Sequence, residues 1–211
     1  MWLLQPLVEL CLLFAVFFEM YERQQLRAWP LAMIPAEVHV IGDSLSAGIA
    51  EEQDSLWPNL VARDWNVPVR NHAQPGADTK SAIRQAESVG DDCLVIIEIG
   101  GNDLLSGRNS RQVAIDLEQL IAHLQSRQRT LIMFELPVPP IPRAYEWARL
   151  QRRLARRYGV NLIPRRDFAK ALLATGATTD GLHLSPAGHR AVANLLSRTL
   201  INRSSRERRG P

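Results

Sequence analysis

Ser44, Asp180 and His183 are the residues of this sequence whose types and spacing point most directly to chemistry. A serine hydroxyl is a weak nucleophile until a base removes its proton, and the base needs an acid to orient it. His183 is the candidate base. Asp180 lies three residues earlier, close enough to accept a hydrogen bond from the imidazole. These three residues predict a serine nucleophile that attacks an acyl group.

Acyl transfer also requires hydrogen-bond donors directed at the oxyanion that develops during attack. Three candidates follow predicted strands: the backbone N–H of Ser44, the backbone N–H of Gly76 and the side-chain amide of Asn102. A glycine at position 76 permits close backbone approach or a positive φ. Asn102 follows two glycines, which leave room for its amide to face a pocket. These groups are the predicted oxyanion donors.

The elements that would position these residues alternate regularly along the chain. Short apolar runs predict five strands, at 37–42, 67–71, 93–99, 130–136 and 160–164. Stretches of helical periodicity lie among them, at 46–64, 77–88, 110–128, 143–158 and 186–201. This alternation predicts an α/β fold, a three-layer α/β/α sandwich with a central parallel sheet of about five strands. Ligands of such sheets bind beyond the carboxyl ends of the strands, where the candidate residues stand.

The composition is that of one folded domain. The chain has 211 residues, of which 46% are hydrophobic and 22% charged, and its net charge is +3. Cys11 and Cys93 provide neither a disulfide framework nor a metal cluster and are interpreted as small buried hydrophobic residues. We expect an apolar N-terminal segment at 1–30, a catalytic domain at 34–201 and a polar tail at 202–211.

Four segments together resemble the motifs of a known family. GDSL at 42–45, Gly76, G-x-N-D at 100–103 and D-x-x-H at 180–183 are similar to the conserved blocks of the SGNH hydrolase, or GDSL lipase/acylhydrolase, family. The resemblance covers most of the folded part, and the string GGNDLLSG looks most like the bacterial thioesterase/lysophospholipase branch. It implies a flavodoxin-like sandwich, no cofactor and no metal. It also implies a Ser44–Asp180–His183 triad and an oxyanion hole formed by Ser44, Gly76 and Asn102.

The favoured function is therefore hydrolysis of a carboxylic ester or thioester, on small-molecule or lipid-like acyl substrates, through a Ser44 acyl-enzyme. Carbohydrate O-acetylesterase activity is the alternative within the same chemistry. A metal-dependent phosphoesterase is the alternative of a different class, because strand-end carboxylates and a histidine could hold a divalent cation. That site would use Asp43, Asp103, Asp180 and His183. It would leave Ser44 and Asn102 unexplained.

Other polar residues are expected to have structural roles. Asp43 and Asp103 are expected to brace loops. The remaining histidines show no partner pattern and are expected to stay outside the chemistry: His39, His72, His123 and His189. Five arginines share one helical face, which we interpret as solvated, with anionic lipid headgroups as the alternative contact: Arg149, Arg152, Arg153, Arg156 and Arg157. No nucleic-acid partner is expected, because no recognised binding motif accompanies them. The sequence does not indicate an oligomeric state.

Residues 2–18 are nearly all apolar and must be buried in lipid, in the protein or in a partner. Their length favours a membrane anchor, whereas Pro6 and Glu9 favour a helix packed on the domain. A cleaved signal peptide is disfavoured, because no basic residue precedes the run and no small-residue cleavage site follows it. Arg23 and Arg27 lie just beyond it and favour a cytoplasmic location for the domain.

The anchor interpretation predicts how the protein fractionates. Full-length protein should sediment with membranes and resist extraction by high salt, whereas a truncated protein that starts near Ile34 should be soluble and keep esterase activity. Full-length protein that stays in the soluble fraction without detergent would exclude the anchor. A truncated protein that is soluble but unfolded would instead show that residues 2–18 belong to the core of the domain.

Overall fold

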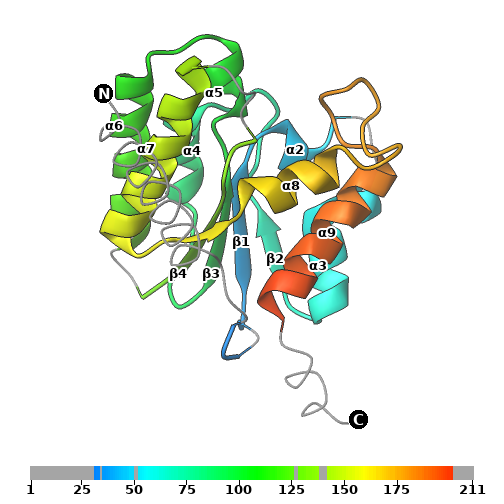
Figure 1. Cartoon of the computed structure of the whole chain (residues 1–211). Coiled ribbons are helices and arrows are strands. Elements are labelled where there is room, and N and C mark those ends of the chain that lie inside the picture. The colour runs from blue at the N-terminus through cyan, green and yellow to red at the C-terminus, as the bar shows by residue number, and fades with distance from the viewer. Residues whose placement is uncertain (1–30, 34, 50–51, 126–127, 138–141, 202–211) are drawn as a thin grey trace, which may run out of the picture.

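The computed structural model describes residues 31–33, 35–49, 52–125, 128–137 and 142–201 (Figure 1). The predicted N-terminal segment 1–30 and the tail 202–211 lie outside these residues, so the anchor remains a prediction. In the part of the chain that is described, no helix is long and apolar enough to cross a membrane.

The centre of the fold is a sheet of five parallel strands in the order β2-β1-β3-β4-β5, which confirms the predicted architecture. The strands are β1 (Val38–Gly42), β2 (Val69–Asn71), β3 (Leu94–Glu98), β4 (Thr130–Phe134) and β5 (Asn161–Ile163). All five residues of both β1 and β3 are buried. Continuous apolar runs suit such strands because helices cover both faces of the sheet.

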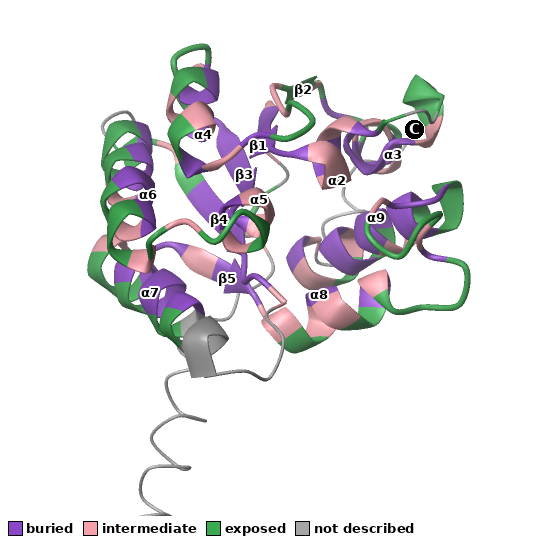
Figure 2. Cartoon of the chain, turned by 90° about the horizontal axis from the view of Figure 1, so that it is seen from above, coloured by how far each residue is buried: buried purple, intermediate pink, exposed green. Residues whose placement is uncertain are grey.

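Helices form a layer on each face (Figures 1 and 2). One layer contains α4 (Thr79–Ala86), α6 (Ser110–Gln125) and α7 (Pro142–Tyr158). The other contains α3 (Trp57–Trp65), α8 (Arg165–Leu172) and α9 (Pro186–Leu200). Alternate side chains of β3 enter the two cores: Val95 and Ile97 pack towards the first layer, and Leu94 and Ile96 towards the second. Cys93 is buried in the first core, as predicted.

The helix predicted at 46–64 is wrong as a single element. The chain there forms α2 (Ser44–Ala47), a 3-10 turn η1 (Gln53–Ser55) and then α3. Gly48, with φ +72°, ends α2, and Pro58 occupies the first turn of α3. A glycine with positive φ commonly ends a helix, and a proline commonly occupies the first turn of one. The sequence therefore carried the signal for the break between α2 and α3. The short helices α5 (Gly101–Leu105) and α8 were not predicted.

The arginine face of α7 also differs from its prediction at one position. Arg152 is buried and donates from Nε to Glu135 Oε1 at 2.6 Å, whereas Arg149, Arg153, Arg156 and Arg157 are exposed. Glu135 follows β4 and also accepts hydrogen bonds from the backbone and side chain of Arg165. Arg152 therefore ties α7 to the carboxyl end of the sheet.

Candidate active site

Ser44 is the first residue of α2 and is separated from the end of β1 only by Asp43. The Asp43 carboxylate caps this helix, because its Oδ1 accepts the N–H of Leu45 at 3.0 Å. Gly42 is required by packing: a Cβ at this position would lie 2.7 Å from Ser46 Oγ and 2.9 Å from the Glu98 carbonyl oxygen. The strand therefore turns sharply into the helix and leaves Ser44 partly exposed.

Gln85 of α4 fixes the backbone just before this turn. Its side-chain oxygen accepts the N–H of Gly42 at 2.9 Å, and its side-chain nitrogen donates to the Gly42 carbonyl at 3.0 Å. The Gln85 amide thus acts like a short piece of neighbouring strand beside the last residue of β1. Gln85 could not be identified from the sequence, since nothing there distinguishes it from any other polar helix residue.

Gly76 lies at the centre of a tight turn. The N–H of Ala77 donates to the carbonyl of Gln74 at 3.1 Å, and Gly76 has φ +74°. Proline at position 75 followed by a glycine with positive φ is the pattern of a type II turn. The turn alone therefore accounts for a glycine at this position, and an oxyanion role for its N–H remains a proposal.

Asn102 lies at the start of α5, after Gly100 with φ +113°. Its side-chain nitrogen donates to the Ala77 carbonyl at 2.9 Å and to Asp43 Oδ2 at 3.2 Å. Both amide hydrogens therefore have acceptors. Donation to an oxyanion would require one of them to change partner, and the longer contact, to Asp43, is the easier one to exchange.

The backbone N–H groups of Ser44 and Gly76 differ from the Asn102 amide in their hydrogen bonding. Within the described residues, neither of these N–H groups takes part in a hydrogen bond. An unused donor at the start of a helix and another in an exposed turn are both available to a ligand.

Asp180 and His183 are in direct contact, as their spacing predicted. His183 Nδ1 lies 2.6 Å from Asp180 Oδ2, and Asp180 Oδ1 accepts the N–H groups of Leu182 at 2.9 Å and His183 at 2.7 Å. These hydrogen bonds, chiefly the one from the His183 backbone, hold the pKa of Asp180 well below its usual range. Asp180 is therefore ionised at neutral pH and can stabilise an imidazolium ion.

The loop that carries this pair is anchored at both ends. The N–H of Thr179 donates to the His183 carbonyl, and the N–H of Ser185 donates to the Ala177 carbonyl, each at 2.9 Å. Ser185 also caps α9, because its side chain accepts the N–H of Gly188, and Pro186 occupies the first helical position, as predicted. The loop and α2 lie at the same end of the molecule (Figure 1).

The hydroxyl of Ser44 and the ring of His183 are not joined by a hydrogen bond in the described part of the chain. His183 does interact electrostatically with Asp43, the residue before Ser44. Contacts between a nucleophile and its base are often loose without substrate and tighten when substrate binds.

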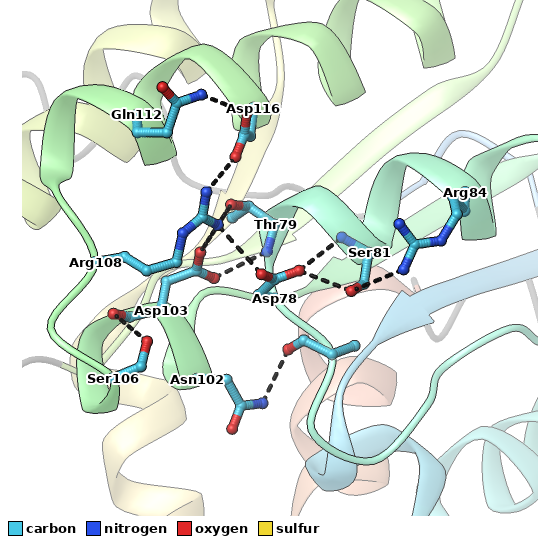
Figure 3. Close-up of polar contacts among 11 residues, drawn as sticks. Asp78, Thr79, Ser81, Arg84, Asn102, Asp103, Ser106, Arg108, Gln112 and Asp116 are labelled. Carbon is cyan, nitrogen blue, oxygen red and sulfur yellow. Dashed lines mark hydrogen bonds and ion pairs between the residues drawn. The ribbon is translucent and has the colours of Figure 1, made fainter.

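A network around Arg108 ties the Gly76 turn to the Asn102 segment (Figure 3). Asp103 accepts the backbone N–H and the hydroxyl of Thr79, each at 2.9 Å. Arg108 bonds Asp103, Thr79 and Asp78 through one nitrogen and Asp116 through the other, the last at 2.6 Å. The N-terminus of α4 is thereby held against α5. The predicted bracing role of Asp103 is confirmed.

Two carboxyl groups are buried beneath the β1–α2 turn. Asp43 and Glu98 are each 2% exposed, and their side chains hydrogen-bond to one another. Burial raises the pKa of Asp43 to about 6 and raises that of Glu98 well above its ordinary value. Glu98 was not predicted from the sequence, although an acidic residue inside the apolar run CLVIIEI was a signal that could have identified it.

Three of the histidines that show no partner pattern in the sequence make contacts that the structure reveals. His39 Nδ1 lies 2.8 Å from His72 Nε2, and their rings stack with centroids 5.1 Å apart. His39 also contacts Glu37 at 3.2 Å. His189 accepts the N–H of Trp57 at 3.3 Å. These contacts join segments far apart in the sequence, which residue spacing does not reveal.

Among the described residues, no group of three or more His, Cys, Asp or Glu side chains could hold a metal ion. The residues of the phosphoesterase alternative are engaged elsewhere. Both oxygens of Asp103 are bonded by Thr79, and Asp43 accepts from Leu45 and Asn102.

Comparison with known proteins supports one family. Residues 40–191 match the model of the GDSL-like lipase/acylhydrolase family. An arylesterase of Vibrio mimicus is 26% identical over 175 residues, covering 77% of this chain and 86% of that protein. The thioesterase 1/protease 1/lysophospholipase L1 of Escherichia coli strain K12 is 23% identical over 169 residues, covering 76% and 81%.

Solved structures share the fold. A psychrotrophic esterase from Pseudoalteromonas sp., inhibited by monoethylphosphonate, superposes with a TM-score of 0.70 at 19% identity and covers 78% of this chain and 96% of its own. The structure of TesA gives a TM-score of 0.70 at 22% identity, covering 77% and 97%. Because the family model spans most of the described residues, the chain belongs to the GDSL-like lipase/acylhydrolase family and is a hydrolase.

Proposed function

We propose that the protein is a serine esterase that cleaves carboxylic ester or thioester bonds of acyl substrates through a Ser44 acyl-enzyme. The observation that carries the proposal is the 2.6 Å contact between Asp180 and His183. The pair lies at the end of the sheet where the chain passes from β1 into α2, whose first residue is Ser44. A paired acid and base beside a serine at a strand-to-helix turn supports nucleophilic catalysis.

In the proposed reaction, His183 Nε2 accepts the proton of Ser44 Oγ while that oxygen attacks the acyl carbon. The carbonyl electron pair moves onto its oxygen, which becomes the oxyanion. Asp180 holds the Nδ1–H tautomer of the imidazole and stabilises the imidazolium ion. Collapse of the tetrahedral intermediate breaks the bond to the leaving group, which takes the proton from His183. Water then hydrolyses the acyl-enzyme by the same steps.

The oxyanion would accept hydrogen bonds from the N–H groups of Ser44 and Gly76 and from the Asn102 amide. The two unused backbone donors support this assignment. Asn102 would exchange its 3.2 Å contact to Asp43 for the oxyanion and keep its 2.9 Å contact to Ala77. One donor of this kind typically contributes about 10²–10³ in kcat.

Exposed apolar side chains next to the candidate residues support an acyl chain as part of the substrate. Ile49 follows α2, Leu105 ends α5 and Leu182 precedes His183; they are 54%, 66% and 48% exposed. The relatives named arylesterase and thioesterase/lysophospholipase support the same substrate class. A panel of p-nitrophenyl esters of increasing chain length, acyl-CoA, lysophospholipid and an acetylated sugar would identify the substrate and test the O-acetylesterase alternative.

Covalent labelling tests the nucleophile. A fluorophosphonate probe should modify Ser44 in the wild-type protein, because only an activated serine attacks it at a useful rate. Peptide mass spectrometry should find the adduct on Ser44 and none in Ser44→Ala or His183→Ala. Ser55→Ala, which removes the hydroxyl of an η1 serine, is the matched control and should label normally. An adduct on a different serine, with Ser44 unmodified, would contradict the proposed mechanism.

Asp180→Asn tests the acid. The asparagine oxygen can still accept the N–H groups of Leu182 and His183, but its NH₂ would face His183 Nδ1 and favour the wrong tautomer. We expect kcat to fall by as much as about 10⁴ with the fold unchanged by circular dichroism.

Asp54→Asn, in η1, is the control for loss of an exposed carboxylate and should retain wild-type kcat. A folded Asp180→Asn enzyme with wild-type kcat and an unchanged pH–rate profile would show that another group orients the base.

A further inference from the structure

Glu98 is a carboxyl group buried at the end of an apolar strand, and no step of the proposed reaction uses it. It is the last residue of β3 and is 2% exposed. The sheet register pairs it with Gly42 on β1, so that its side chain lies under the turn that carries Ser44. Ser46 Oγ of α2 donates to Glu98 Oε2 at 2.9 Å.

The second partner of Glu98 is Asp43. Two carboxyl groups in hydrogen-bond contact in a buried site cannot both be ionised, because neighbouring negative charges repel strongly where water does not screen them. Burial, followed by the charge of Asp43, raises the pKa of Glu98 well above its ordinary value. Glu98 is therefore the group that keeps its proton, and it donates a hydrogen bond to Asp43.

Asp43 in turn contacts two parts of the candidate site. Its Oδ1 accepts from the Leu45 N–H at 3.0 Å, and its Oδ2 accepts from the Asn102 amide at 3.2 Å. The chain of contacts from Glu98 through Asp43 thus reaches both the nucleophile turn and an oxyanion donor.

We propose that Glu98 is a positioning residue of the ester-hydrolysing site: its carboxyl proton holds Asp43 in place and limits the negative charge behind Asn102. The inference rests on the proposed function. It assigns the final residue of β3 a role through Asp43, with no contact to the substrate.

The Glu98 proton sets the negative charge of the Asp43–Glu98 pair. When Glu98 is protonated, the pair carries one negative charge, and Asp43 shares its electron density with Glu98 and so releases the Asn102 amide more easily to an oxyanion. When Glu98 is ionised, two negative charges lie behind the position where an oxyanion forms and oppose its formation. Two other titratable side chains interact electrostatically with Asp43: Asp103 of α5 and His183 of the loop before α9. Gln85 of α4 lies nearby as a neutral amide.

The raised pKa of Glu98 determines how activity and stability change with pH. A group whose pKa is raised on folding contributes stability that is present at acidic pH and lost as the pH rises through its folded pKa. Glu98 and Asp43 are both of this kind. As the pH rises through the raised pKa of Glu98, ionisation of this carboxyl group should therefore lower kcat. The stability of the fold should fall over the interval between the ordinary pKa of a glutamate and that raised pKa.

The test compares two substitutions. Glu98→Leu removes the donor and should lower kcat by about 10- to 100-fold, the size of effect that misplaced catalytic groups produce, with KM nearly unchanged. Glu98→Gln mimics the protonated carboxyl, because its oxygen can accept from Ser46 and its nitrogen can donate to Asp43. It should recover most of the kcat lost in Glu98→Leu. Since glutamine does not ionise, the decline of kcat and Tm with rising pH should also be smaller than in the wild type.

Glu135→Gln is the matched control, a buried carboxylate just beyond β4 whose partners are Arg152 and Arg165. It should lower Tm without changing how kcat declines with rising pH. A decline of kcat with rising pH that is the same in wild type and Glu98→Gln, or a Glu98→Gln enzyme as slow as Glu98→Leu, would overturn the proposal.

A readout that needs no activity separates this proposal from the proposed function. In ¹³C-glutamate-labelled protein, the Glu98 carboxyl signal, assigned by its loss in Glu98→Gln, should titrate well above the ordinary range of a glutamate. The Asn102 side-chain ¹⁵N signal should shift in Glu98→Leu and return in Glu98→Gln. Titration of Glu98 near its ordinary value would refute the positioning role even in an active esterase. An inactive wild-type protein with these NMR results would refute only the ester hydrolysis.

Discussion

The candidate site depends on Asp43, a buried carboxylate whose oxygens both need hydrogen-bond partners. One of its oxygens accepts from Leu45, the other accepts from Asn102, and Glu98 contacts it from below. Leaving such a group unpaired would cost several kcal/mol. The β1–α2 turn, the start of α5 and the end of β3 are therefore placed relative to one another by a single side chain.

Further contacts place the remaining donors against this centre. Parallel strands end at one edge of the sheet, so each following turn begins close to the others. Gln85 fixes Gly42 before the β1–α2 turn, and Asp103 with Arg108 holds the N-terminus of α4 beside α5. In the proposed mechanism, the backbone N–H groups of Ser44 and Gly76 are therefore directed at the oxyanion before any substrate arrives. Donors that need no reorganisation contribute most to stabilising charge in a transition state.

The parts of this structure that could be predicted are those encoded locally. Short apolar runs predicted the positions of all five strands, and the contact of Asp180 with His183 followed from a spacing of three residues. Helices of four or five residues are too short to show periodicity, so α5 was missed and α2 was merged with α3. The pairs Glu98–Asp43 and Gln85–Gly42 were missed because they depend on which strands and helices become neighbours. Burial of Arg152 likewise depends on where β4 ends beside α7.

A high-resolution crystal structure of the protein after reaction with a phosphonate ester would test the central claim most directly, because the phosphoryl oxygen imitates the oxyanion. The account predicts phosphorus bonded to Ser44 Oγ. It also predicts a phosphoryl oxygen about 2.7–3.2 Å from the backbone nitrogens of Ser44 and Gly76 and from the Asn102 side-chain nitrogen, which has left Asp43. A phosphoryl oxygen directed away from both Gly76 and Asn102, or phosphorus on a different side chain, would contradict it.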